Sequence, residues 1–195
     1  MANRTGTYVA FDGLGQTDPT KSDFRYYGTI QAWASNNNID FKYVDSHDKT
    51  SAVRDTSKIA TLEARIQERL RSSKNMIVIL SSDTRKSGSM LSYEIELAVD
   101  TYALPLIVTY PGYRAIRNPS PMSGRWPNAL STRINNASAK AIHLAFAKEP
   151  ILDAIGQFSV NSNDLTGSKN VYSIAAHRQW SLLNTSEQDG NYLKS

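Results

Sequence analysis

Cysteine is absent from this sequence of 195 residues. Its absence excludes a disulfide framework, a thiolate nucleophile and any zinc site built on sulfur. Histidine is scarce as well, since the chain has only His47, His143 and His177, and their wide separation matches no metal-binding spacing. We therefore expect no metal centre.

Long hydrophobic runs are also missing. No apolar stretch approaches the roughly 20 residues that a membrane-spanning helix requires, and the first residues lack the apolar segment of a signal peptide. We therefore expect a cytoplasmic protein without a membrane partner. The formal net charge is +4, but lysine and arginine are dispersed among acids. Because nucleic-acid binding needs a concentrated basic patch, we expect no nucleic-acid partner either.

The proportions that remain are those of a globular protein. Hydrophobic residues make up 40% of the chain and charged residues 21%, and the length suits one domain with an appendage. We expect a domain over residues 1–158. Residues 159–195 should then form a polar linker, rich in serine and asparagine, and a helical tail.

The most informative stretch spans residues 75–110. Residues 76–80 are a short run rich in isoleucine and valine that ends in polar residues, which favours a buried strand. A polar loop over residues 81–89, an amphipathic helix and a second apolar strand near residues 104–108 follow, so the stretch predicts one βαβ unit. Ligands of open α/β sheets bind at the carboxyl ends of the strands, which makes this loop the first place to look for chemistry.

Periodicity elsewhere extends the unit to an α/β domain. The expected strands and helices alternate along the chain, with strands at residues 7–11, 39–44 and 139–147 and helices at residues 22–35, 57–70 and 150–158. This pattern predicts a flavodoxin-like fold, with a mostly parallel sheet of five strands in the order 2-1-3-4-5 and helices on both faces. Residues 111–128 give no periodic signal. Trp126 within them either anchors the loop to the core or stacks on a substrate.

One acid stands out on the helix that follows the central loop. Leu91, Ile95 and Ala98 form its apolar stripe, and Glu94 lies beside that stripe, whereas Glu96 and Asp100 point towards solvent. A carboxylate at the margin of a buried face can be partly desolvated, which suits it to acid–base work or to stabilising a cation. The alternative is a helix-surface acid near the positive end of the helix dipole.

Several enzyme classes are disfavoured by missing motifs. No G-x-S-x-G elbow and no G-x-x-x-x-G-K-[ST] loop occur, so a serine hydrolase and a P-loop ATPase are not expected. Asp12 follows the first strand as an acid does in response-regulator receivers. However, the phosphorylatable aspartate that would end the third strand is replaced here by Ser81 and Ser82.

Three segments are distinctive when taken together: Y-V-A-F-D at residues 8–12, F-K-Y-V-D at residues 41–45, and V-I-L-S-S-D-T-R-K-S-G-S-M-L-S-Y-E-I-E-L-A at residues 78–98. They resemble the TIR-like domains of bacterial anti-phage defence, in particular the TIR-like proteins of the Thoeris system. The resemblance covers roughly residues 5–150 and is most specific at Lys86-Ser87 and at the Glu-Ile-x-x-Ala pattern that starts at Glu94.

This resemblance implies an enzyme that acts on NAD⁺ with Glu94 as the catalytic residue. The reaction would cleave the nicotinamide–ribose bond and continue by hydrolysis or by cyclisation to a cyclic ADP-ribose-type signal. That signal would activate a separate partner effector. NAD⁺ is then a substrate and no cofactor is expected, while a phage-derived trigger and self-association are possible requirements.

Further residues are expected to bind NAD⁺ because the loops after the first three strands should converge at one edge of the sheet. Phe11 is placed to stack on a base, and Asp12 and His47 to reach the ribose or nicotinamide. Lys86, with amides near Ser87, would meet the diphosphate, since a helix N-terminus favours an anion. Asp45 and Ser82 are further expected substrate-binding residues. Met90 stands four residues before Glu94, where family members often have tryptophan.

Two alternatives stay open from the sequence. The first is a non-catalytic TIR-like module that signals through protein contacts. The second is a nucleoside deoxyribosyltransferase-like enzyme, which has a related architecture and also uses a carboxylate at a ribose.

Overall fold

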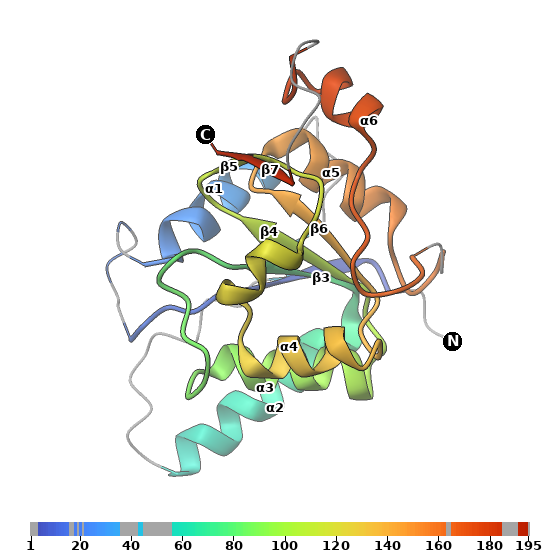
Figure 1. The fold of residues 1–195 in the computed structure, drawn as a ribbon. Coiled ribbons are helices and arrows are strands. Elements are labelled where there is room, and N and C mark those ends of the chain that lie inside the picture. Colours follow the sequence, from blue (N-terminus) through green and yellow to red (C-terminus); the bar gives the residue numbers. More distant parts are fainter. Residues whose placement is uncertain are drawn as a thin grey trace.

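The computed structural model describes residues 4–15, 18, 20, 22–35, 43–44, 56–162, 165–184 and 191–194. Within these residues, five strands form a parallel sheet in the order β2-β1-β3-β4-β6, at the centre of the molecule (Figure 1). The strands are β1 (Gly6–Ala10), β2 (Tyr43–Val44), β3 (Ser73–Ile79), β4 (Leu106–Tyr110) and β6 (Ala141–Ala145). The predicted mixed α/β class is confirmed.

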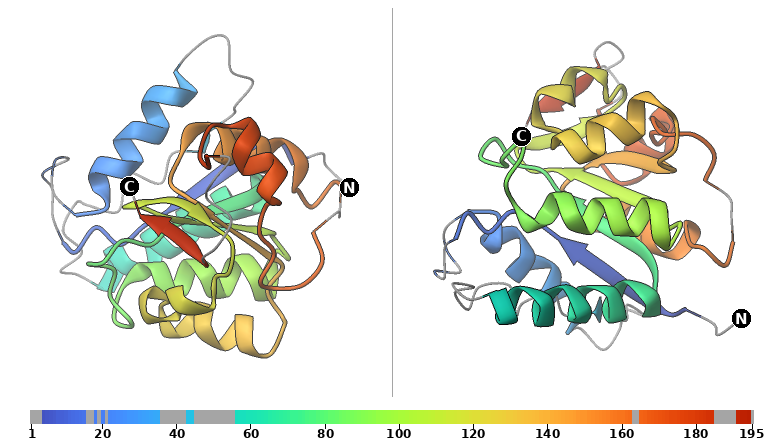
Figure 2. Two further views of the ribbon diagram at one scale, coloured as in Figure 1. Left: turned by 45° about the horizontal axis from the view of Figure 1, so that its top comes forward. Right: turned by 90° about the horizontal axis from the view of Figure 1, so that it is seen from below.

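Helices cover both faces of the sheet (Figure 2). One face packs against α2 (Thr56–Ser72), α3 (Met90–Glu96) and α4 (Asn128–Asn135), and the other against α1 (Phe24–Ala34) and α5 (Lys148–Gln157). Successive strand side chains point to opposite faces, so Tyr8 contributes to the core under α2, α3 and α4, whereas Val9 contributes to the core under α1 and α5. Because both faces are covered, the central strands are apolar without alternation.

The helix after the β3 loop is longer than α3 alone. A π-helical turn, Leu97–Thr101, continues it, and the backbone N–H of Tyr102 donates to the Leu97 carbonyl 3.0 Å away. The apolar stripe predicted from the sequence is buried, with Leu91 1% exposed and Ile95 and Ala98 fully enclosed. Glu96 and Asp100 lie at the surface as expected, and both pair with Arg133 of α4.

Residues 111–128 hold more structure than their sequence indicates. They contain β5 (Tyr113–Ile116) and a 3₁₀ helix, Ser120–Arg125. β5 pairs antiparallel with β7 (Tyr192–Lys194), which is drawn in red beside it in Figure 1. The pairing joins segments far apart in the chain, so no local pattern could predict it.

Trp126 anchors this region to the core, as the first of the two interpretations predicts. Its side chain is 2% exposed, and its Nε1–H donates to the Tyr110 hydroxyl 2.7 Å away. That hydroxyl lies 2.7 Å from Nδ1 of His143, whose Nε2 donates to the Ser168 carbonyl 2.9 Å away. Burial lowers the pKa of His143 to about 4, so the ring is neutral and joins β4, β6 and two loops through hydrogen bonds.

The segment expected to be a polar linker contacts the sheet. Val160 N–H donates to the Lys74 carbonyl at 2.9 Å, and His143 N–H donates to the Asn170 carbonyl at 2.8 Å, so residues on either side of 163–164 are bonded to β3 and β6. Helix α6 (Ile174–Gln179) follows. The division at residue 158 stays a prediction. In the described part of the chain, no helix has the length and apolar character needed to cross a membrane.

Candidate functional site

Glu94 is enclosed by the fold rather than placed at its margin. Its side chain has no exposed area, and the equally buried Tyr8 of β1 donates a short hydrogen bond from its hydroxyl to Glu94 Oε1. The contact arises because Glu94 neighbours Leu91 and Ile95 on the face of α3 that meets the sheet. An acid was expected beside the buried stripe, but the structure places it beneath the helix, against the middle of a strand.

The phenol of Tyr8 acts as a permanent donor at this position. Burial, followed by the charge of Glu94 and the hydrogen bond to it, raises the pKa of Tyr8 well above its ordinary value. The hydroxyl therefore keeps its proton and donates it to the Glu94 carboxylate. A neutral donor satisfies this oxygen without contributing a positive charge.

Asp12 joins the loop after β1 to the loop after β3. Its Oδ2 accepts from Arg85 Nε at 2.9 Å and its Oδ1 accepts from Arg85 Nη2 at 2.8 Å. The backbone N–H groups of Arg85 and Leu14 donate to the same carboxylate at 3.1 and 3.0 Å. Burial by itself would raise the pKa of Asp12, but the hydrogen bonds from Arg85 and Leu14 hold that pKa below its usual value.

A second contact between the loops involves Asp23, which precedes α1. Its side chain is 1% exposed, and the Thr84 hydroxyl donates to its Oδ2 at 3.0 Å. Thr84 Oγ1 accepts in turn from the Ser81 N–H at 3.0 Å. Burial raises the pKa of Asp23 to about 6; the nearby Ser81 and Thr84 hydroxyls oppose this rise and the charges of Asp12 and Asp83 add to it.

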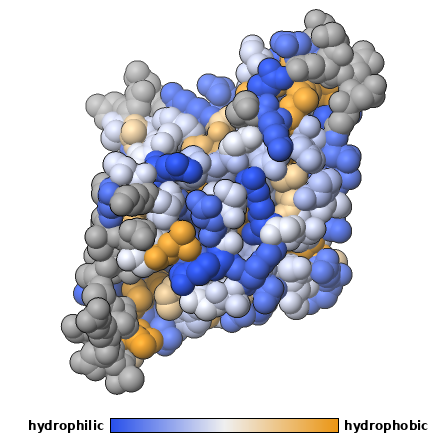
Figure 3. All heavy atoms as spheres, turned by 60° about the vertical axis from the view of Figure 1, so that its left-hand side comes forward, coloured by the Kyte–Doolittle hydropathy of each residue, from blue (hydrophilic) through white to orange (hydrophobic). Residues whose placement is uncertain are grey.

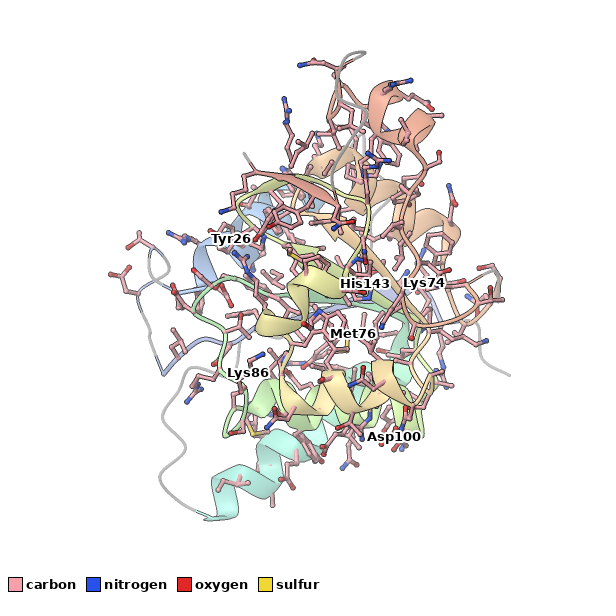
Figure 4. The ribbon with its side chains drawn as sticks, in the orientation of Figure 1. Tyr26, Lys74, Met76, Lys86, Asp100 and His143 are labelled. Carbon is pink, nitrogen blue, oxygen red and sulfur yellow. The ribbon has the colours of Figure 1, made fainter. Side chains whose placement is uncertain are left out.

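Lys86 fastens the far end of the same loop. Its Nζ donates to the carbonyls of Ser123 and Trp126, each 3.0 Å away, and its own carbonyl accepts from the Asn128 N–H at 2.8 Å. Figure 4 shows the lysine between the green loop and the 3₁₀ helix. The ammonium expected at a diphosphate is therefore bonded to the protein at two of its three N–H groups.

The other predicted binding residues that the structure describes differ in how exposed they are. The Phe11 ring is 3% exposed and packs against Phe24 and Tyr27, with ring centroids 5.5 and 4.8 Å away. Ser82 is exposed, and Met90 is half-buried at the edge of the core. Asp45 and His47 lie outside the described residues. A binding role for each of these residues stays a prediction.

Sequence reasoning missed four residues that organise this region: Tyr8, Asp23, Thr84 and Arg85. An acid just before a helix is a normal capping signal, but the Asp23 side chain makes no cap and reaches across to Thr84 instead. The space-filling view in Figure 3 shows the side towards which these loops point. Its surface is mainly hydrophilic, with hydrophobic atoms in small separate groups. Among the residues that the structure describes, no three histidines or acids are grouped to hold a metal ion.

One family model matches a large part of the chain. The family model described as Thoeris protein ThsB, TIR-like domain, matches residues 8–116. The match begins at Tyr8, contains Glu94 and the loop between β3 and α3, and extends to the end of β5. Because it covers more than half of the sequence, the chain belongs to the family of TIR-like domains of the Thoeris anti-phage defence protein ThsB.

Proposed function

We propose that this protein is an NAD⁺-cleaving enzyme that breaks the nicotinamide–ribose bond and forms a cyclic ADP-ribose-type signal for a partner effector. The observation that carries the proposal is the Glu94 carboxylate, which is held by Tyr8 at the position that the family resemblance assigns to the catalytic glutamate. The sheet order β2-β1-β3-β4-β6, which is that of a flavodoxin-like sheet, supports the same assignment. The signal would be made and used in the cytoplasm.

The chemistry suits a carboxylate. When the nicotinamide–ribose bond breaks, its electron pair moves to the pyridinium nitrogen and nicotinamide leaves as a neutral molecule. The ribose is left with oxocarbenium character at C1′, and a fixed negative charge beside it lowers the energy of that transition state. Attack by water, with loss of a proton, completes hydrolysis, whereas attack by a nucleophilic group within the same ADP-ribose completes cyclisation.

On this proposal, the enclosed position of Glu94 belongs to a resting form of the protein. A side chain with no exposed area cannot touch a substrate without a movement of its surroundings. We therefore expect the isolated protein to cleave NAD⁺ slowly or not at all. Activity would appear after a phage-derived trigger or self-association moves the elements around α3.

Nicotinamide release measured by mass spectrometry tests the proposal. Wild-type protein from phage-challenged cells should release nicotinamide and a cyclised or hydrolysed ADP-ribose. In Glu94→Gln the rate of nicotinamide release should be lower by at least about a hundredfold. Glu96→Gln is the matched control, because Glu96 is an exposed acid on the same helix and should keep wild-type activity. Full activity in Glu94→Gln, or none in triggered and assembled wild type, refutes the proposal.

A non-catalytic signalling module is the second candidate, and the burial of Glu94 favours it. The bonds that Asp12 and Lys86 make within the protein point the same way. In that case Glu94→Gln would leave phage protection intact in cells and triggered wild type would release no nicotinamide. The two measurements together therefore separate the candidates.

A further inference from the structure

Tyr8 occupies an unusual place for a tyrosine that only fills a core. It lies in the middle of β1, has no exposed area, and packs with the core under α2, α3 and α4. Its hydroxyl is directed at Glu94 Oε1 from the sheet, across the interface between the sheet and α3. A phenylalanine would fill nearly the same volume, so what the hydroxyl adds is its hydrogen bond rather than packing.

The hydroxyl restricts Glu94 in two ways. A phenol on a central strand is rigid, because the strand and the ring are both enclosed, so the accepting oxygen is fixed in position. The donated hydrogen bond also orients the carboxylate, because Oε1 must face the phenol. A fixed position and a fixed orientation are what preorganised stabilisation of an oxocarbenium ion needs.

We propose that Tyr8 is a positioning residue that holds Glu94 as an oriented carboxylate for the cleavage of NAD⁺. The inference rests on the proposed function for its catalytic consequence, but the positioning itself can be observed without turnover. Tyr8 does not touch the substrate; it acts through Glu94.

Other titratable groups surround the pair. Arg69 of α2 lies near enough to Tyr8 to oppose the rise in its pKa, and Tyr27 of α1 adds slightly to that rise. On the outer side of α3, Glu96 and Asp100 pair with Arg133 of α4 at the surface. Removing the Tyr8 hydroxyl leaves all of these groups in the protein.

The experiment compares Tyr8→Phe with Tyr110→Phe in the triggered protein. Both tyrosines are fully buried in the same core, but the Tyr110 hydroxyl bonds to His143 and Trp126 instead of Glu94. For Tyr8→Phe we expect kcat to fall about tenfold to a hundredfold with KM nearly unchanged.

Tyr110→Phe is the control for simple loss of stability. It should reduce the amount of folded protein but leave kcat of the folded fraction unchanged. If Tyr8→Phe also leaves kcat unchanged, or if both variants lower kcat of the folded fraction equally, the proposal is overturned.

Crystal structures of wild type and Tyr8→Phe supply a readout that does not need activity. The Glu94 carboxylate should leave its position beside β1 when the hydroxyl is removed, and an unchanged position refutes the positioning role. Failure of the proposed function gives a different result. In that case triggered wild type would release no nicotinamide, while the crystal structures would still decide whether Tyr8 fixes Glu94.

Discussion

Asp23→Asn should stabilise the protein at neutral pH, although it removes a charged side chain that accepts a hydrogen bond. The carboxyl is 1% exposed, and its burial raises its pKa to about 6 from an ordinary value of 3.8. A buried carboxyl with a raised pKa is more easily ionised in the unfolded chain than in the folded one. Asparagine has nearly the same shape and still accepts from Thr84, but it carries no charge.

The size of the effect follows from the pKa difference. Two pKa units correspond to about 3 kcal/mol, since one unit is about 1.36 kcal/mol. As pH rises, the Asp23 carboxyl loses its proton in the unfolded chain before it does so in the folded protein. The free energy of unfolding of wild type therefore falls by this amount between about pH 4 and pH 6. At pH 4 both side chains are neutral in the folded state and the two proteins differ little in this respect. Between pH 4 and pH 7, the stability of the variant relative to wild type should increase by about 2–3 kcal/mol.

Urea unfolding of both proteins at half-unit steps from pH 4 to pH 8 measures this difference. Glu149→Gln is the control, because Glu149 is an exposed acid that is not among the charges acting on Asp23, so the general effect of removing one carboxylate can be subtracted. A stability difference for Asp23→Asn that is independent of pH, or that becomes less favourable as pH rises, would show that folding does not raise the pKa of this carboxyl.

Two further substitutions test contacts that fix the loops. Tyr110→Phe deprives Trp126 Nε1 and His143 of a buried partner and should cost roughly 2–4 kcal/mol in urea unfolding; a loss below about 1 kcal/mol would mean that water replaces the hydroxyl. Arg85→Gln breaks the two side-chain bonds to Asp12 and should cost about 1–2 kcal/mol at pH 7, discounted because the arginine side chain is 46% exposed. Because Arg85 helps to hold the pKa of Asp12 below its usual value, this cost should shrink as pH falls towards 3, and a cost that is equal at both pH values contradicts the pairing.

Hydrophobic pattern predicted the elements whose burial is decided locally. Residues 76–79 of the apolar run lie in β3 because each of their side chains meets a covered face of the sheet. The spacing of Leu91, Ile95 and Ala98 placed Glu94 beside the buried stripe, and the large apolar ring of Trp126 was the reason for the core-anchoring interpretation. In each case the free energy of burying one residue's own surface determines the outcome, so the sequence contains the information.

The missing features depend on partners far away in the chain. Asp12 meets Arg85 and Asp23 meets Thr84 across separations of 73 and 61 residues, and such pairs form only after two loops have been brought to one edge of the sheet. Lys86 was expected at a diphosphate because a lysine charge can be read from the sequence. The two backbone carbonyls that accept its hydrogen bonds cannot be read in this way, because every residue has a carbonyl. Loop contacts of this kind are determined by tertiary geometry, not by periodicity.

The three buried acids of this region differ in what holds them, and the difference bears on function. Asp12 is bonded to a guanidinium, so its negative charge is already neutralised and serves to join two loops. Asp23 accepts from a hydroxyl and is partly protonated near neutral pH. Glu94 accepts from a phenol that cannot ionise in the usual pH range and brings no positive charge. Both side-chain oxygens of Asp12 accept from Arg85 and Asp23 is bonded to a loop hydroxyl, so among these acids Glu94 is the one that we propose for stabilising a developing ribose cation.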